Sequence, residues 1–465
     1  MLGRTVAVTL LILGGWSGVA AAADGQNEAL MRLLQVLRDR GSITAAEYDE
    51  IRLVATATPA PAAATPPPAP APAPAPSTTD LQPAVNKALA GKWYEKIGLR
   101  GYSQFRYSDV MAQEGLPIEV PSDRSVNPNE SFVLRRGRFV FSGDATEHLA
   151  LYAQMDFNGS TGAADFSLQM RDLYADLFLD KHKAWRIRLG QSKVPYGFVN
   201  MQSSQNRAPL ERPDALNTAV EGERDLGASV MWASPEARKR FRDLTGLGLK
   251  GSGDYGVVSF GAYGGQGLNR SDQNHQVHVF GRVQYPFKLS NGQYMELGVQ
   301  AYRGRFVSPT QAITSGGATF TPTQRTDGEL DARVAGTFVW YPQPVGLEAE
   351  WNVGTSPALS TDFRTIGHDT INGGYLQANY RLHNASGTWF PFARWNYYDG
   401  SRKFARNAPR EKVNEIDFGV EFAHWAEVEL TGMYTRTITR TRTGAFPYGD
   451  ATKGNRVGVQ VQWNY

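Results

Sequence analysis

The sequence contains no cysteine, so it can form neither a disulfide nor a metal site built on thiolate ligands. Its formal net charge is only +3, which is too small to indicate a nucleic-acid partner. Catalytic motifs such as Gly-x-Ser-x-Gly and His-Glu-x-x-His are missing, and the seven histidines are scattered. We therefore expect a protein that is not an enzyme and that uses no cofactor and no metal.

Long apolar runs are also scarce. The one clear run, residues 6–19, follows Arg4 and ends in the alanines at 20–23, which is the arrangement of a secretory signal peptide over residues 1–23. No second run is long enough for a membrane helix, so a helical membrane protein is excluded. A hydrophobic content of 41% is nevertheless compatible with a membrane barrel, because its strands need apolar side chains only at every second position.

Strict alternation is the pattern that the sequence does contain. Between Val457 and Tyr465 every second residue is apolar and the residues between are small or polar, so one strand face suits hydrocarbon and the other suits water. About sixteen such runs, each of about 9–13 residues, follow Lys92. The pattern predicts an all-β fold, namely a transmembrane antiparallel β-barrel of about 16 strands in the bacterial outer membrane.

Two regions precede the predicted barrel, which occupies residues 92–465. Residues 24–55 carry leucines at helical spacing and a capping box at 44–47, which predicts a short helical segment in the periplasm. Residues 56–91 begin with an almost pure run of proline and alanine, which favours a semi-rigid linker. The helical segment is either a trimerisation or tethering element or a mobile appendage.

The links between predicted strands alternate in length. Short links such as 143–146 and 290–292 follow even-numbered strands, whereas long links such as 108–130 and 356–370 follow odd-numbered ones. Short periplasmic turns opposite long external loops are expected of an outer-membrane barrel. One long even link, 234–254, breaks the pattern and leaves the strand boundaries there open.

Several motifs resemble the phosphate-selective porin O and P family. The run Leu-Arg-Arg-Gly-Arg-Phe-Val-Phe-Ser-Gly at 134–143 is similar to the second strand of that family, and Gly-Gln-Ser-Lys-Val-Pro at 190–195 is similar to its GQ-x-K-x-P segment. Glu-Arg-Pro at 211–213 and Arg-Asp-Leu-Gly at 224–227 fit the loop and strand that follow. The resemblance implies a sixteen-stranded, homotrimeric anion channel, often for phosphate or polyphosphate.

Basic residues supply the candidate anion pathway. By strand counting, residues 193–225 form the third external loop, which folds into the lumen in sixteen-stranded porins. Arginine suits phosphate because its planar fork offers two donors to two oxygens and keeps its charge. The candidates that face the lumen or lie in this loop are Arg100, Arg136, Arg138, Arg186, Arg188, Lys193, Arg207, Arg212 and Arg224.

Other interpretations of these residues stay open. Many arginines inside a barrel pair with carboxylates of the wall, and lumen-facing acidic residues such as Glu348 and Asp417 cluster on the late strands. Arg135 has outward parity, which predicts a position near a membrane interface or in a subunit contact. Tyrosines of lumen parity could instead serve a sugar-specific porin. We therefore expect small anions and outer-membrane lipid as partners, with a general diffusion or sugar-specific porin, or an outer-membrane tethering protein, as alternatives.

Overall fold

The computed structural model describes residues 93–115, 118, 126, 132–161, 164–315, 317–442 and 451–465, together with residues 35, 38, 39, 45, 48 and 49. The contacts divide the chain into two units, Met1–Leu81 and Gln82–Tyr465. The predicted signal peptide and the whole of the predicted linker lie outside the described residues. The six described residues of the predicted helical segment are helical, but the segment as a whole remains a prediction. Among the residues that can be described, no helix is long and apolar enough to cross a membrane.

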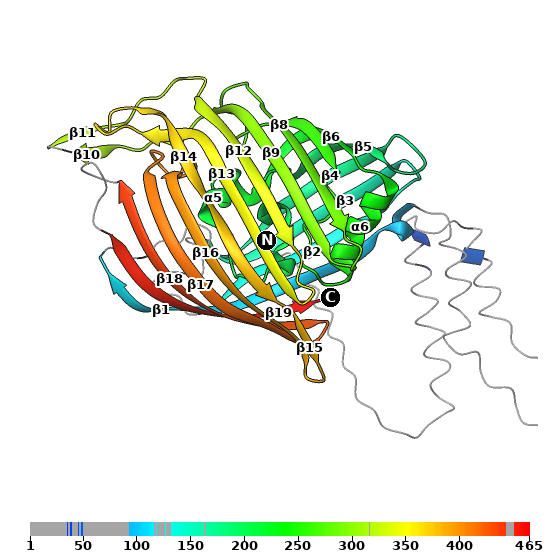
Figure 1. Ribbon diagram of the computed structural model, residues 1–465. Helices are drawn as coiled ribbons and strands as arrows, with labels where there is room; N and C mark the ends of the chain where they lie inside the picture. The colour runs from blue at the N-terminus through cyan, green and yellow to red at the C-terminus, as the bar shows by residue number, and fades with distance from the viewer. Residues whose placement is uncertain are drawn as a thin grey trace, which may run out of the picture. The chain divides into compact units, whose positions relative to one another are not determined.

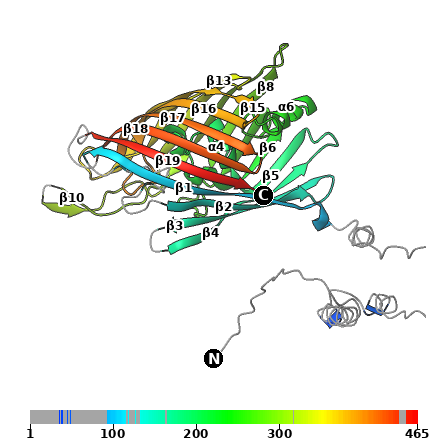
Figure 2. The same ribbon diagram turned by 90° about the horizontal axis from the view of Figure 1, so that it is seen from below.

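The second unit is a closed antiparallel barrel of sixteen strands, as predicted (Figures 1 and 2). The short β15 continues β14, and both pair with β16. The barrel closes because β1 pairs with both β2 and β19. The barrel strands are β1 (Gly98–Glu114), β2 (Phe132–Asp144), β3 (Leu149–Thr161), β4 (Ala164–Phe178), β5 (Trp185–Lys193), β6 (Arg224–Trp232), β7 (Val258–Tyr263), β8 (His278–Lys288), β9 (Tyr294–Phe306), β12 (Glu329–Trp340), β13 (Val345–Leu359), β14 (Ile366–Tyr380), β15 (Leu382–Asn384), β16 (Gly387–Ser401), β17 (Arg410–Trp425), β18 (Val428–Arg442) and β19 (Thr452–Asn464).

The remaining elements are short. A small hairpin, β10 (Ile313–Ser315) with β11 (Ala318–Phe320), lies in an external loop. The helices are η1 (Trp93–Lys96), α4 (Phe198–Met201), η2 (Ser204–Asn206), α5 (Asp214–Asn217), η3 (Glu221–Glu223) and α6 (Pro235–Gly246).

Alternation along each strand separates the two faces of the wall. On β17, Glu415 and Asp417 are buried toward the lumen, whereas Ile416 and Phe418 are exposed on the outer face. The outer face thus offers apolar side chains to lipid and the inner face carries polar groups, as expected for a membrane barrel. The ladder of backbone hydrogen bonds leaves no open edge in this sheet.

Several strands extend further into the external loops than predicted. β1 continues to Glu114, and only residues 360–365 separate β13 from β14, so the predicted long links 108–130 and 356–370 are too long. Beyond the membrane both strand faces carry polar residues, such as Asp109 and Glu114 on the outer face of β1. The backbone hydrogen bonds between strands therefore continue beyond the point where the hydrophobic alternation in the sequence ends.

The long even link that broke the predicted pattern contains a helix and no misplaced strand. α6 lies between β6 and β7, and its N-terminus is capped by Ser234, whose hydroxyl oxygen accepts a hydrogen bond from the amide of Ala237 (3.2 Å). Proline at the first helical position and glutamate after it are favourable there. Its buried face, Ala237, Phe241 and Leu244, recurs at helical spacing.

Candidate functional site: the inner loop and its arginines

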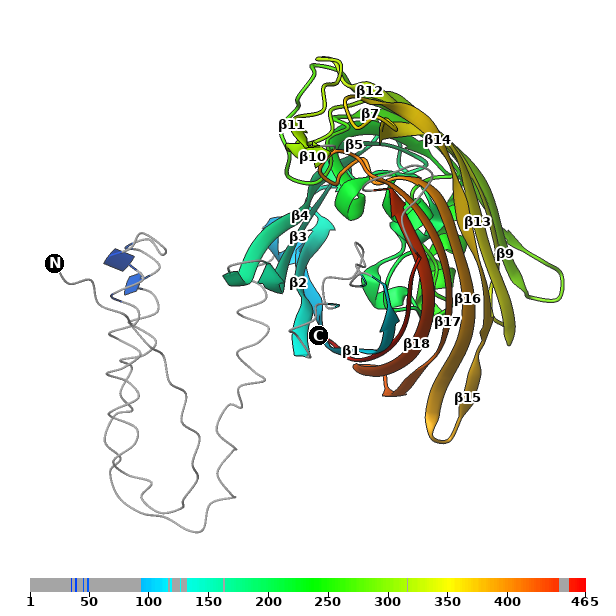
Figure 3. The same cartoon turned by 90° about the vertical axis from the view of Figure 1, so that its left-hand side faces the viewer.

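The link between β5 and β6, residues 194–223, folds into the barrel; we call it the inner loop (Figure 3). Its apolar side chains are buried, including Tyr196 and Phe198, both with no exposed surface. Gly197 makes the turn possible through a positive φ of 81°. The predicted inward course of this loop agrees with the structure.

Hydrogen bonds fix the inner loop to the opposite wall. The amides of Phe198 and Val199 donate to the carboxylate of Glu350 on β13, at 2.5 and 2.9 Å. The hydroxyl of Tyr196 donates to Asn352 at 2.7 Å. Because these buried groups satisfy one another, the loop is a rigid constriction of the lumen.

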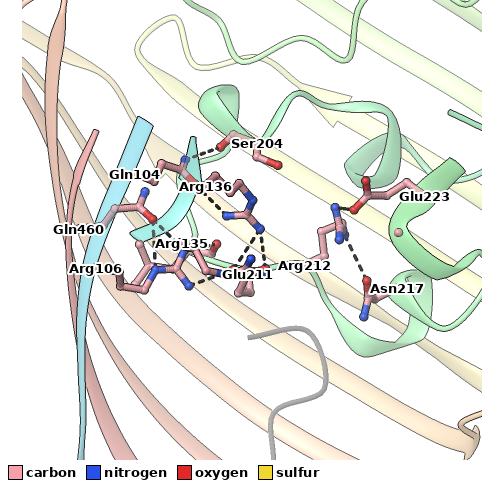
Figure 4. A network of polar contacts seen from close by, with 12 residues as sticks. Gln104, Arg106, Arg135, Arg136, Ser204, Glu211, Arg212, Asn217, Glu223 and Gln460 are labelled. Atoms are coloured by element: carbon pink, nitrogen blue, oxygen red, sulfur yellow. Dashed lines mark hydrogen bonds and ion pairs between the residues drawn. The ribbon is translucent and has the colours of Figure 1, made fainter. Parts of the chain in front are cut away.

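Glu211 of the inner loop is the centre of an arginine cluster on the wall formed by β1 and β2 (Figure 4). Its carboxylate accepts from Arg106 at 2.9 Å, from Arg135 at 2.9 Å and from Arg136 at 3.2 Å. Burial alone would raise the pKa of Glu211, but Arg135, Arg136 and Arg106 outweigh burial and hold its pKa well below the ordinary value. One carboxylate therefore faces three guanidinium groups.

The outward position predicted for Arg135 is wrong, because β2 contains a bulge. Gln104 pairs with Arg136 but the next residue, Phe105, pairs with Leu134, so Arg135 has no partner in the register. A bulge shifts side-chain parity by one residue, and Arg135 turns inward to Glu211.

A second bulge, between β3 and β4, acts in the same way on Arg171. Gln154 pairs with Asp172 and Met155 with Met170, which leaves Arg171 between them. Its guanidinium donates to the carbonyl of Gly222 at 3.0 Å. Sequence analysis missed Arg171 as a lumen residue. The signal that could have found it is an arginine at a lipid-facing parity, which is costly unless a bulge redirects it.

Most of the predicted pathway residues pair with carboxylates. Five of them do so in addition to Arg136: Arg138 with Asp156 (3.0 Å), Arg186 with Asp254 (3.3 Å), Arg188 with Asp176 (2.7 Å), Arg212 with Glu223, and Arg224 with Asp172 (3.0 Å). These arginines contribute to holding the wall and the inner loop together. Their donors are largely occupied.

Three predicted residues have no carboxylate partner in the described part of the chain. Lys193 donates to two carbonyls of the inner loop, those of Met201 (2.9 Å) and Gln202 (2.5 Å). Arg100 is exposed to the lumen and lies 6.0 Å from the ring centre of Tyr152.

Arg207 is the third of these residues. It is buried in the inner loop, and none of its three guanidinium nitrogens has a hydrogen-bond partner among the described residues. Burial, with Arg136 nearby, lowers the pKa of Arg207 to about 9, so the group stays charged at neutral pH.

Two cavities of the lumen lie on either side of the inner loop. The external one, about 280 Å³, is lined by six arginines and three carboxylates, with Arg402 contributed by an external loop. The periplasmic one, about 440 Å³, is lined by Arg100, Arg188, Lys193 and Arg224 against two aspartates. Positive groups outnumber negative groups in the linings of both cavities.

Most of the lumen tyrosines serve the wall. Tyr302, Tyr341 and Tyr375 are buried and donate to Asp331, Glu296 and Glu348 respectively. Tyr152 and Tyr174 line the periplasmic cavity, but they stack on each other with ring centres 4.9 Å apart. Within the described residues, no group of three histidine, aspartate or glutamate side chains could hold a metal ion.

Known proteins of similar fold were found by structure comparison. The outer membrane channel DcaP of Acinetobacter baumannii is 12% identical and covers 79% of this chain and 97% of its own, with a TM-score of 0.48. The anion-selective porin from Comamonas acidovorans is 13% identical and covers 79% and 99%, with a TM-score of 0.42. OmpT of Vibrio cholerae in its trimer form is 10% identical and covers 79% and 99%, with a TM-score of 0.46.

A search of the curated proteins found no match. The sequence profile of the family described as "Phosphate-selective porin O and P" matches residues 118–465, three quarters of the chain and nearly all of the barrel. This match confirms the resemblance of the motifs at 134–143 and 190–195 to that family. The chain, a sixteen-stranded barrel with a loop folded into its lumen, belongs to the phosphate-selective porin O and P family and is an outer-membrane porin.

Proposed function

We propose that this porin allows passive diffusion of small anions, with phosphate-type anions as its cargo, and that it works as a homotrimer. The observation that carries the anion preference is Arg207, a buried cation in the constricting loop whose donors have no protein acceptor among the described residues. Its three nitrogens are shielded from solvent, so the charge would attract a passing anion through its field in a region of low dielectric and not by direct contact.

Charges on both sides of the constriction support the same function. The external cavity would concentrate anions through its excess of arginines, and the periplasmic cavity would receive them at Arg100 and Lys193. Paired arginines such as Arg188 share their charge with a carboxylate and bind an anion only weakly. Several weak sites in series let an ion enter and leave again, as conduction requires.

The experiment is a reversal-potential measurement on the purified full-length protein in planar bilayers under a KCl gradient. Wild-type channels should prefer chloride, and Arg207→Gln should lower the chloride-to-potassium permeability ratio by roughly twofold or more, because a charge in a narrow passage of low dielectric acts strongly on ions. Millimolar phosphate should block chloride current in the wild type and less in the variant.

The matched control is Arg303→Gln, which removes an exposed arginine from the outer face of β9. It should leave selectivity and block unchanged. A wild-type reversal potential near zero without phosphate block would refute the anion preference and indicate a general diffusion porin.

A further inference from the structure

The outer face of β17 and β18 changes from apolar to basic toward the external end. Phe418 pairs in register with Tyr434, and both are exposed on the lipid side. At the following outward positions Ile416 pairs with Arg436, Asn414 pairs with Ile438, and Lys412 pairs with Arg440. The exposed side chains of Arg436 and Arg440 share the outward parity of Tyr434.

This basic patch, defined by Lys412, Arg436, Arg440 and Lys453, places like charges close together. Lys412 and Arg440 are directly opposite on neighbouring strands, an arrangement that is destabilising by itself. Lys453 of β19 pairs in register with Ile438, between the two arginines of β18. The sheet therefore holds four cations on one small area of its outer surface.

Protein carboxylates neutralise only part of the basic patch. Asp399 lies 3.7 Å from Lys412, and Glu114 lies 3.2 Å from Lys453 in an exposed pair that contributes little. Arg436 and Arg440 form no ion pair with any described residue. Within the described residues, no carboxylate therefore competes with an external anion for these two guanidinium groups.

Aromatic side chains show that the patch begins at the level of a membrane interface. Trp351 and Trp395 stack on the outer face with ring centres 6.0 Å apart. Their indole nitrogens donate to Asn372 and Asn414, both at 2.8 Å. Trp395 pairs in register with Ile416, the same residue that pairs with Arg436. Tryptophans with a polar partner on a barrel exterior are typical of the headgroup region.

We propose that the basic patch binds a phosphate group on the headgroup of an outer-membrane lipid. The charge complementarity comes from Arg436 and Arg440, whose forks suit phosphate oxygens, with Lys412 and Lys453 adding positive potential. Below the patch, Phe418, Tyr434 and Val457 form an apolar surface against which acyl chains can pack. A lipid meets both surfaces at once, whereas free phosphate would use only the upper one.

The test uses the full-length protein purified in neutral detergent, with bisphosphorylated lipid A as the probe and native mass spectrometry as the readout. The double variant Arg436→Gln/Arg440→Gln should bind lipid A roughly 30-fold more weakly, the loss expected for two basic side chains at an anionic membrane surface. Arg303→Gln, which removes one outward arginine of β9 far from β17 and β18 in the strand order, should bind as the wild type does. Single-channel conductance should be unchanged in both, which shows that the barrel is folded.

The comparison ligands separate a lipid site from other occupants. Dephosphorylated lipid A should bind no better to the wild type than to the double variant, and 5–10 equivalents of inorganic phosphate should not displace lipid A. The proposal fails if the double variant binds lipid A like the wild type, or if the phosphate-free lipid distinguishes the two proteins equally well. It also fails if inorganic phosphate displaces the lipid, or if the double variant changes the oligomeric mass in lipid-free detergent, since the patch would then be a free-anion site or a subunit contact.

Discussion

Arg207 combines burial with the lack of a described partner, whereas the other basic residues around the inner loop are bound to carboxylates or carbonyls. Its neighbour in the loop, Glu211, is already shared by three arginines. The protein thus separates two roles among residues of the same type. Paired arginines hold the constriction together, and Arg207, which has no described partner, adds positive potential to it from a buried position.

The pH dependence of selectivity follows from the pKa of Arg207, which burial lowers to about 9. This pKa lies above 7, so the guanidinium is charged at neutral pH. It also lies below the ordinary arginine value, so the charge is lost as the pH rises through 9. We expect a constant chloride preference between pH 6 and 8 and a weaker one at pH 10. Reversal potentials measured across this range provide the test, and Arg207→Gln should show no such decline. An equal decline in the variant would assign the titration to another group.

Side-chain parity predicted which arginines face the lumen, because a regular strand fixes direction with a period of two. It misplaced Arg135 and missed Arg171, since both sit at bulges, and an arginine at a lipid-facing parity indicates that a bulge is present but not where the register shifts. The sequence also could not predict which carboxylate each lumen arginine pairs with. The partner of Arg186 is Asp254, which is 68 residues away in a periplasmic link.

At the scale of single elements, α6 stands out because it occupies a periplasmic link. Phe241 and Leu244 belong to one buried apolar cluster with Phe198 of the inner loop and with Tyr341 of the link between β12 and β13. The helix therefore packs against the inner loop, and Thr245 near its C-terminal end lines the periplasmic cavity.

Weakening the packing of α6 against the inner loop should widen the periplasmic end of the lumen. Phe241→Ala deletes a buried ring, a change that typically costs about 3–5 kcal/mol, so we expect a loosened inner loop and a higher single-channel conductance. Arg242→Ala on the exposed face of the same helix should change neither. Unchanged conductance in Phe241→Ala, with the protein still folded, would show that α6 does not limit the pore. The Ser-Pro-Glu start and the spacing of Ala237, Phe241 and Leu244 would have sufficed to predict this helix.

At the scale of the whole molecule, the barrel and the segment before it are separate units. Strand number was predictable because each membrane crossing demands a full alternating run, whereas loop length was not, because the strands extend beyond the membrane. β1 starts at the end of the barrel that carries the short turns, so we propose that the preceding residues enter from the periplasm.

Deleting residues 24–81 should leave conductance and selectivity unchanged, since the contacts assign this segment to a unit distinct from Gln82–Tyr465. Planar-bilayer recordings of the shortened protein, with the predicted signal peptide at residues 1–23 retained for export, would test this. The mass of the assembly in detergent would show in addition whether the segment contributes to trimerisation. Loss of channel activity in a folded, correctly inserted protein would contradict the division into independent units.

Barrel closure also imposes an order on assembly. The backbones of Gly101 and Tyr465 exchange two hydrogen bonds, at 2.6 and 3.0 Å, and Ser103 contacts a residue 362 positions along the chain. Every other strand of the wall can pair with a neighbour soon after that neighbour emerges from the export machinery. β1 has to wait for β19, with its hydrogen-bonding groups unsatisfied on one side. During biogenesis this seam is the part of the nascent barrel that most needs a chaperone or an insertion machine to cover it.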